Sequence, residues 1–406
     1  MGILKELNYL GEKISGENPR KAKISESLDY IVEQLSGDAN DKTEVSTIIH
    51  KIADNYSGSE SGDVSEYFKS NIGAGRIVYD GNEDNVVGYI SGIESMLKKI
   101  PNVTVEGTDL SYAFYGCQLP TIPQLNTSNV TNMKMMFYLC PNLTTIPQLN
   151  TSSVTNMSQM FGRCYNLITI PQLDTSNVID MNYMFSKCGN LTTVPTLNTS
   201  SVESTQGMFE DCSSLTTIPQ LDTSSVTDMG LMFNGCNSLI TVPTLNTSSV
   251  ENMQWMFSGC SSLNTIPLLN MSNVSYASGM FAGCSSLTTI PQLDTSNITD
   301  MSEMFLGCSN LTTVPILNTS SVENMYHIFD GCDSLSNESL NNILTMCANV
   351  SENYYDSKTL SNIGLSQEQA TTCTTLSNWA AAEAAGWSVG EYYNDEYDEE
   401  ESNEGE

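Results

Sequence analysis

The side chains with the clearest chemical potential are ten cysteines at regular intervals. They lie at positions 117, 140, 164, 188, 212, 236, 260, 284, 308 and 332, one interval of 23 residues followed by eight of 24. Parallel side chains stacked at the strand spacing of ~4.8 Å point the same way, whereas a disulfide prefers Cβ atoms ~3.8 Å apart. No CxxC pair occurs. We therefore expect buried, unbridged array cysteines and neither metal nor cofactor; a bridge between Cys347 and Cys373 stays open.

Paired carboxylates are a second source of chemistry. Asp180 and Glu203 could serve as the acid and base of a glycosidase. Such acids recur at regular positions as a solvated stripe with no aromatic cleft around them, so we expect no enzyme. The two histidines, His50 and His327, offer little for a catalytic triad or a His-based metal site. Threonine columns such as the one containing Thr145 could bind ice, but each is followed by Ile/Val-Pro.

One residue per repeat varies where its surroundings are nearly constant. The residue five before each cysteine is diverse, and so is the one preceding it; Tyr and Trp there could stack on sugars or anchor a protein partner. Neutral drift at exposed positions explains the same diversity. We expect the Trp255 side chain to face solvent. The predicted ligand-binding residues are Gln159, Tyr183, Leu231, Trp255, Glu303, Tyr326 and His327.

The interval that spaces the cysteines also spaces the apolar residues. Each unit has Leu, Ile/Val and Leu three residues apart, which indicates a short extended segment, and then Met-x-x-Met-Phe, which indicates a helical or 3₁₀ turn. A coil of 24 residues buries too little apolar surface to fold alone, but stacked coils bury one another. The sequence therefore predicts a repeat solenoid of about ten coils over residues 106–335, each with a short strand and a short helix.

A polar column accompanies the apolar ones. It reads Asn126, Asn150, Asp174, Asn198, Asp222, Asn246, Asn270, Asp294 and Asn318, with no two aspartates adjacent. Stacked carboxylates would repel each other, so the aspartates stay at least two coils apart. We expect the Asn/Asp-Thr-Ser run to hydrogen-bond its own turn backbone. Ile-Pro-Gln-Leu-Asp and Val-Pro-Thr-Leu-Asn units also alternate, which suggests that pairs of coils duplicated.

These motifs resemble a known family. The run from Leu173 to Cys188, Leu-Asp-Thr-Ser-Asn-Val-x-x-Met-x-x-Met-Phe-x-x-Cys, resembles the BspA-type leucine-rich repeat of bacterial surface proteins, over more than half the chain. The resemblance implies a right-handed, leucine-rich-repeat-like solenoid used for adhesion or recognition, without catalytic residues. Tyr9–Pro19 and Ile24–Ile31 resemble a short N-terminal module of phage virion-associated proteins. Ile363–Cys373 and Ala384–Trp387 are similar to the segment that closes these repeats in phage-encoded proteins.

The flanks divide into smaller units. Residues 1–57 predict a helical hairpin for attachment, which docks on a partner or oligomerises, and residues 58–64 a flexible linker. Residues 65–105 predict a mixed N-terminal cap with an extended piece at Arg76–Tyr79 and a helix at Ser91–Lys99. Residues 336–390 predict a helical C-terminal cap, and residues 391–406 an acidic, disordered tail. The cap helices are expected around Leu340–Met346, at Gln367–Thr375 and at Ser377–Ala385, with Trp387 closing the apolar end.

Charge narrows the choice of partner. Lys+Arg 15 against Asp+Glu 47 gives the 406 residues a net charge of −32, which repels nucleic acid and anionic lipid. The sequence has neither a run of roughly 18 apolar residues nor a signal-peptide core at its start, so we expect no membrane insertion and no Sec export.

Three hypotheses of function remain. The first is a non-enzymatic phage fibre or decoration protein on the virion surface, joined to a virion structural protein through its N-terminal module and contacting a host-surface glycan or protein through its solenoid. The second is a BspA-type adhesin on a bacterial cell surface. A glycan-acting enzyme is the most remote. Host, ligand, place on the particle, binding face and oligomeric state stay open, a homo-oligomer included.

Overall fold

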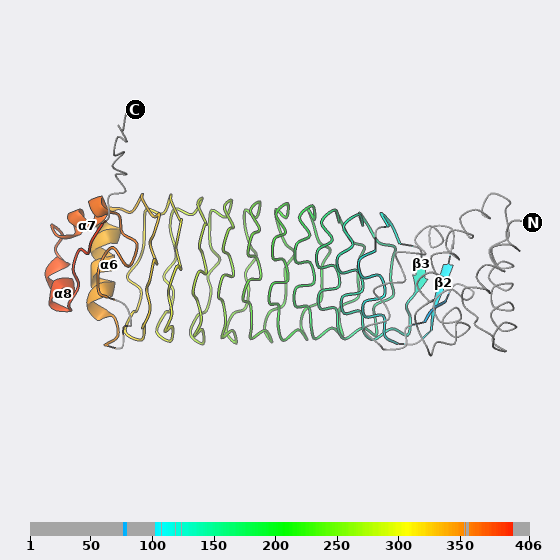
Figure 1. Cartoon of the computed structure of the whole chain (residues 1–406). Helices are drawn as coiled ribbons and strands as arrows, with labels where there is room; N and C mark the ends of the chain where they lie inside the picture. The colour runs from blue at the N-terminus through cyan, green and yellow to red at the C-terminus, as the bar shows by residue number, and fades with distance from the viewer. Residues whose placement is uncertain are drawn as a thin grey trace, which may run out of the picture.

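The chain forms a solenoid whose coils stack one behind another along a single axis (Figure 1). The structure, a computed structural model, describes residues 76–78, 102–106, 108–117, 119–122, 124–352, 354 and 357–392. The predicted N-terminal hairpin, the helix at 91–99 and the acidic tail beyond residue 392 lie outside these residues. The repeat solenoid predicted from the cysteine interval is confirmed.

The core consists of apolar columns that run the length of the array. Met157, Met160, Phe161 and Cys164 of one coil are all fully buried, and their equivalents stack above and below them. The phenylalanine rings of successive coils, from Phe114 to Phe329, stack with centroids 5.3–5.8 Å apart and planes within 2–24° of each other. Each internal ring thus contacts two neighbours, so the apolar surface of one coil is buried by the next.

The segment before each cysteine is a run of β-turns where the sequence suggested a helical or 3₁₀ turn. Met160 N donates to Met157 O (3.1 Å), and Cys164 N donates to Phe161 O (3.1 Å). The alternate N–H groups point to the next coil: Gln159 N donates to Asn182 O (2.8 Å) and Phe161 N to Met184 O (2.9 Å). An α-helix would use its N–H groups internally, so the β-turns are what allow this segment to link coils.

The opposite side of each coil is extended and is linked by side chains. Ser152 N donates to Asn150 Oδ1 (3.1 Å), which confirms the predicted turn around the Asn/Asp column. The buried threonine instead bridges coils: Thr175 Oγ1 donates to Asn198 O (2.9 Å) and accepts from Asn198 N (2.8 Å). This threonine column supplies ladder bonds that irregular extended backbone does not make by itself.

Parallel strands extend the stack at its N-terminal end. Strands β1 (Arg76–Val78), β2 (Asn102–Glu106) and β3 (Gln124–Asn126) form a sheet in the order β1-β2-β3. The extended piece predicted at Arg76–Tyr79 is therefore present as β1. Because β2 pairs with β3, the stack begins before residue 106.

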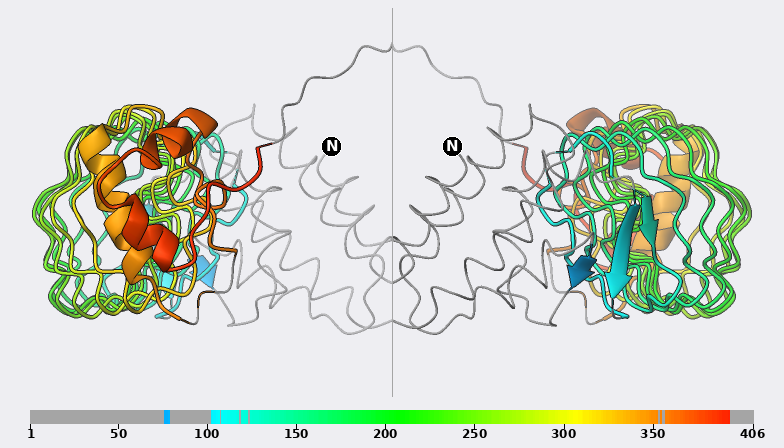
Figure 2. Two further views of the ribbon diagram at one scale, coloured as in Figure 1. Left: turned by 90° about the vertical axis from the view of Figure 1, so that its left-hand side faces the viewer. Right: turned by 90° about the vertical axis from the view of Figure 1, so that its right-hand side faces the viewer.

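Three helices close the C-terminal end, seen end-on in Figure 2. They are α6 (Asn337–Asn349), α7 (Gln367–Cys373) and α8 (Trp379–Ala384), and α6 contacts both others. Each predicted cap helix is present, and Trp387 is buried as expected. Among the described residues, no helix is long and apolar enough to span a bilayer.

Every described cysteine is a free, buried thiol. In the array each thiol from Cys140 onward donates to the carbonyl of a phenylalanine in the preceding coil, as Cys164 Sγ does to Phe137 O (3.0 Å). This geometry agrees with the expectation of unbridged array cysteines. Cys347 and Cys373 are also free.

Candidate recognition site

The variable residues of the sequence form one continuous column, which we call the turn row. It consists of the residue five before each array cysteine from Cys140 to Cys332: Met135, Gln159, Tyr183, Gly207, Leu231, Trp255, Gly279, Glu303 and His327. Their N–H groups bond successive coils, as in Tyr183 N to Gln206 O (2.8 Å) and Trp255 N to Ser278 O (3.0 Å). The structure thus brings six of the seven predicted site residues into one column, with Tyr326 beside its end.

All members of the turn row share an unusual backbone conformation. Their φ angles lie between 53° and 61°. This left-handed region favours Gly, and after it Asn and Asp, because a Cβ atom there crowds the following carbonyl. The row nevertheless contains seven non-glycine residues, several of them large, and no Asn or Asp. Its side chains are therefore retained against a conformational cost.

Two aromatic residues of the row pack against the glycine at the same position of the next coil. A Cβ atom added to Gly207 would sit 2.2 Å from Tyr183 Cε1, and one added to Gly279 would sit 2.2 Å from Trp255 Cε3. Both aromatic side chains are half-buried as a result. The expectation that Trp255 faces solvent is thereby corrected, because the missing Cβ of Gly279 leaves a space that the indole fills.

The environment of Tyr183 is also acidic. Burial, and after it the nearby Glu210 and Asp228, raise the pKa of the Tyr183 hydroxyl. The hydroxyl therefore stays protonated at neutral pH and can donate a hydrogen bond to a ligand.

The C-terminal end of the row combines an aromatic ring with a histidine. Tyr326 is exposed, and its ring meets that of His327 edge-on with centroids 3.9 Å apart. His327 Nδ1 lies 2.7 Å from Asp330 Oδ2. One ring nitrogen is thus occupied within the last coil, which fixes the orientation of the imidazole.

The carboxylates considered for catalysis lie in two different columns. Asp180 Oδ1 accepts a hydrogen bond from Asn182 N (3.0 Å), so this carboxylate organises its own turn. Glu203 is exposed in the neighbouring column, where its backbone links coils: its carbonyl accepts from Thr227 N (3.0 Å). Among the described residues, no group of three or more His, Cys, Asp or Glu could hold a metal ion. The absence of catalysis stays a prediction.

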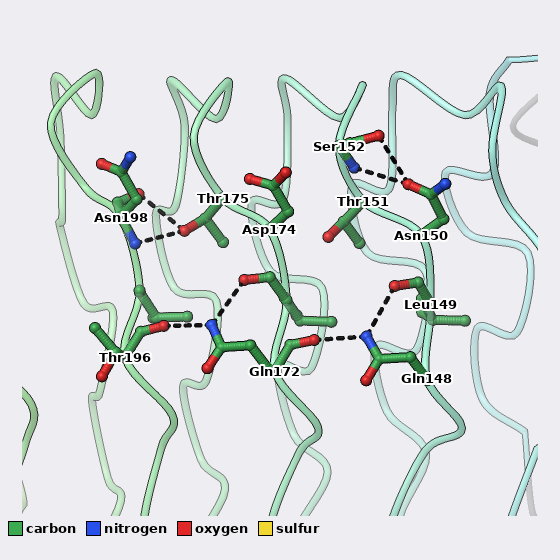
Figure 3. Close-up of a pocket in the computed structure, with 12 residues that line it drawn as sticks. Gln148, Leu149, Asn150, Thr151, Ser152, Gln172, Asp174, Thr175, Thr196 and Asn198 are labelled. Carbon is green, nitrogen blue, oxygen red and sulfur yellow. Dashed lines mark hydrogen bonds between the residues drawn. The ribbon is translucent and has the colours of Figure 1, made fainter.

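A shallow groove on the extended side is the second candidate surface (Figure 3). It spans three coils, from Gln148 to Asn198. Gln172 Nε2 donates to Thr196 O (2.6 Å), and the Asp174 carboxylate accepts from Ser176, which lowers the Asp174 pKa. Most hydrogen-bond donors that line the groove therefore already bond to other groups of the protein. The groove thus presents mainly acceptor oxygens to a ligand.

The comparisons with known proteins find one matching family model and several solved leucine-rich repeat structures. A family model described as "Mycoplasma protein of unknown function, DUF285" matches residues 108–219, 213–290 and 286–384. A leucine-rich repeat protein of T. pallidum is 23% identical over 47% of this chain and 78% of its own, with a TM-score of 0.33. One from Eubacterium ventriosum is 16% identical over 64% and 88%, with a TM-score of 0.36. No curated protein matches the sequence. At these TM-scores, the superpositions add nothing to the coil geometry described above.

Proposed function

The chain belongs to the DUF285 family, and from this premise we propose that it is a non-enzymatic recognition protein that binds a cell-surface glycan or protein through its turn row. The observation that carries the proposal is the retention of large side chains at left-handed backbone positions. Glycine is compatible with this site, since Gly207 and Gly279 occupy it. Drift alone would favour Gly, Asn or Asp at such positions, and the row has Trp, Tyr, Leu, Met, Gln, Glu and His as well.

The half-buried rings suit such a role. Tyr183 and Trp255 are each held against a neighbouring coil, so they lose little side-chain entropy when a ligand covers them. Rigid aromatic side chains of this kind dominate many interfaces and stack on sugar rings.

The finer proposal places the protein on a phage virion. Its support is the resemblance of the N-terminal residues to a virion-associated module, with residues 1–57 joining a virion structural protein. Removing these residues should abolish incorporation into particles while the remaining chain still binds cells. Recovery of the intact protein with bacterial envelopes rather than with particles would favour the bacterial surface alternative.

The turn row is tested by substituting its aromatic residues with glycine, which the backbone accepts. Trp255→Gly and Tyr183→Gly should each weaken binding to intact bacterial cells by roughly 30-fold, the size of a moderate hot spot. Leu139→Gly is the matched control, because Leu139 is also left-handed (φ 59°) but lies outside the row. If both aromatic variants bind like the parent protein, the row is not the contact surface and the groove of Figure 3 replaces it.

A further inference from the structure

Positive charge in the array is confined to its N-terminal coils. Residues 108–187 contain three cations, Lys134, Arg163 and Lys187, and three acids. Residues 188–335 contain twelve acids and neither Lys nor Arg. The solenoid is therefore neutral over its first third and strongly acidic over the rest, so anionic groups are repelled everywhere except near its first coils.

Arg163 lies in a cluster of tyrosines on these first coils. The Tyr138 ring lies on Gly162, because a Cβ added there would be 2.8 Å from Tyr138 Cδ2. The interactions with Tyr138 and then with Tyr165 raise the pKa of the Arg163 guanidinium. Tyr165 is exposed. A guanidinium thus lies among aromatic side chains at an open surface.

Arg163 and Lys187 differ in their partners although they occupy equivalent positions in successive coils. Lys187 Nζ forms an ion pair with Asp211 Oδ2 at 3.0 Å. Within the described residues, no carboxylate lies within ion-pair distance of Arg163. Both residues are left-handed, with φ angles of 61° and 63°, where a long side chain has a conformational cost. Lys187 recovers part of this cost through its ion pair, and the charge of Arg163 is left for a ligand.

We propose that Tyr138, Arg163 and Tyr165 form a subsite for a single acidic sugar. The Arg163 guanidinium binds the sugar carboxylate with two parallel hydrogen bonds, and the exposed Tyr165 ring packs against the apolar face of the sugar. Tyr138 supports the guanidinium, because its own ring is stacked on Tyr115 and lies against Gly162. The inference rests on the proposed recognition function and assigns it a ligand class, because the subsite lies beside the turn row on the same edge of the coils.

The charge distribution favours one acidic sugar over a longer anion. A polyanion or an acidic peptide that reached Arg163 would also approach the coils after residue 187, where all twelve acids repel it. A sugar residue with one carboxylate and otherwise neutral hydroxyls avoids this repulsion. Its flat apolar face also matches the exposed Tyr165 ring better than an extended acidic peptide does.

The test compares two sugars that differ at one carbon. The full-length protein is titrated with methyl glucuronide, which has a carboxylate at C6, and with methyl glucoside, which has a hydroxymethyl group there. We expect the glucuronide to bind tighter by roughly tenfold or more, as hydrogen bonds to charged groups do. Arg163→Asn should remove this preference, and Tyr165→Ala should weaken the binding of both sugars. Asn is chosen because it tolerates the left-handed backbone.

Lys187→Asn is the matched control, at the same position of the next coil but already paired with Asp211. It should keep the preference. Equal binding of the two sugars by the parent protein, loss of the preference in Lys187→Asn, or tighter binding of a glutamate-rich peptide would each overturn the subsite. Cell binding that depends on Trp255 but shows no glucuronide preference refutes the subsite alone. Sugar binding without cell binding refutes the proposed function alone.

Discussion

At the scale of single residues, the array depends on pairs of positions in successive coils that must be filled together. Trp255 and Gly279 occupy the same left-handed position, and the indole uses the space that a Cβ at Gly279 would take. Tyr183 and Gly207 repeat this arrangement. A large side chain in one coil is therefore accommodated by a glycine at the same position of the next coil.

Gly279→Ala is expected to destabilise the protein in two ways. The left-handed backbone costs about 1–2 kcal/mol for a residue with a Cβ, and overlap with Trp255 adds about 1–3 kcal/mol. In a Trp255→Gly background only the backbone cost remains. A double-mutant cycle by urea denaturation should therefore show coupling between the two sites, and additive losses would contradict the pairing.

The positions of the site residues in the sequence were more predictable than their backbone conformation and their neighbours. Comparison of coils identifies the variable column, because its neighbours are nearly constant. The positive φ angles were not predicted, since large residues rarely adopt them and only Gly207 and Gly279 give a hint. The Arg163 cluster was also missed, although the absence of Lys and Arg from residues 188–335 was a usable signal.

At the scale of structural elements, the phenylalanine column contributes the largest buried side chains that pack between coils. Phe233 is fully buried, with its ring 5.8 Å from that of Phe209 and 5.5 Å from that of Phe257. Phe233→Ala should lower the free energy of unfolding by about 3–5 kcal/mol, because it leaves a cavity between two interfaces. The exposed Tyr276 is the control, and Tyr276→Ala should change stability by no more than ~0.5 kcal/mol. Similar losses in the two variants would show that the column does not hold the coils together.

The cysteine column makes the array sensitive to alkaline pH. Burial raises the pKa of Cys188 and of Cys308 from 9.0 to about 12. Between these values the folded state keeps the thiol proton and the unfolded state releases it, so stability falls as pH rises. Each such thiol contributes a slope of up to about 1.4 kcal/mol per pH unit.

The urea midpoint should accordingly decrease steeply between pH 9 and pH 11. Cys188→Ala should reduce the dependence of the unfolding free energy on pH by the contribution of one thiol, about 1.4 kcal/mol per pH unit. It should also lower stability at all pH values, because packing is lost. A midpoint that does not change over this range would mean that the thiols are already ionised in the folded protein.

The structure differs from the predicted elements where the same spacing of apolar residues fits two backbone conformations. Methionines three residues apart share one face in a 3₁₀ turn and in consecutive β-turns, so Met157 and Met160 cannot distinguish them. Inter-coil hydrogen bonding decides in favour of β-turns. Outside the array, α6 was predictable because Leu340, Ile343 and Leu344 show helical periodicity after the repeat ends.

At the scale of the whole molecule, the peptide groups of the turn segments point along the axis of the solenoid. Ser158 O accepts from Met135 N of the preceding coil (2.9 Å), while Gln159 N donates to Asn182 O of the following one (2.8 Å). Such dipoles add from coil to coil, and without a cap the N–H groups of the last coil would lack acceptors. The cap provides acceptors there, since Asn362 O pairs with His327 N (2.8 Å) and Ile363 O with Phe329 N (2.9 Å).

A stack with nearest-neighbour contacts should tolerate the removal of complete coils. Deletion of residues 213–260 removes two coils and joins Cys212 to Ser261, which restores the Cys-Ser-Ser-Leu sequence that follows both Cys212 and Cys260. Every column then stays in register and the helical C-terminal cap is kept, so the shortened protein should fold with lower stability. Deletion of residues 213–224 shifts the columns by half a coil and should prevent cooperative folding.

The same deletion separates the two proposed surfaces. It removes Leu231 and Trp255 from the turn row but leaves Tyr138, Arg163 and Tyr165 in place. The shortened protein should bind cells more weakly than the parent and keep its preference for methyl glucuronide. Small-angle scattering should show an array shorter by about two Phe–Phe spacings of 5.5–5.8 Å. A shortened protein that folds, but loses the sugar preference, would show that acidic-sugar binding depends on the removed coils and not on the Arg163 cluster alone.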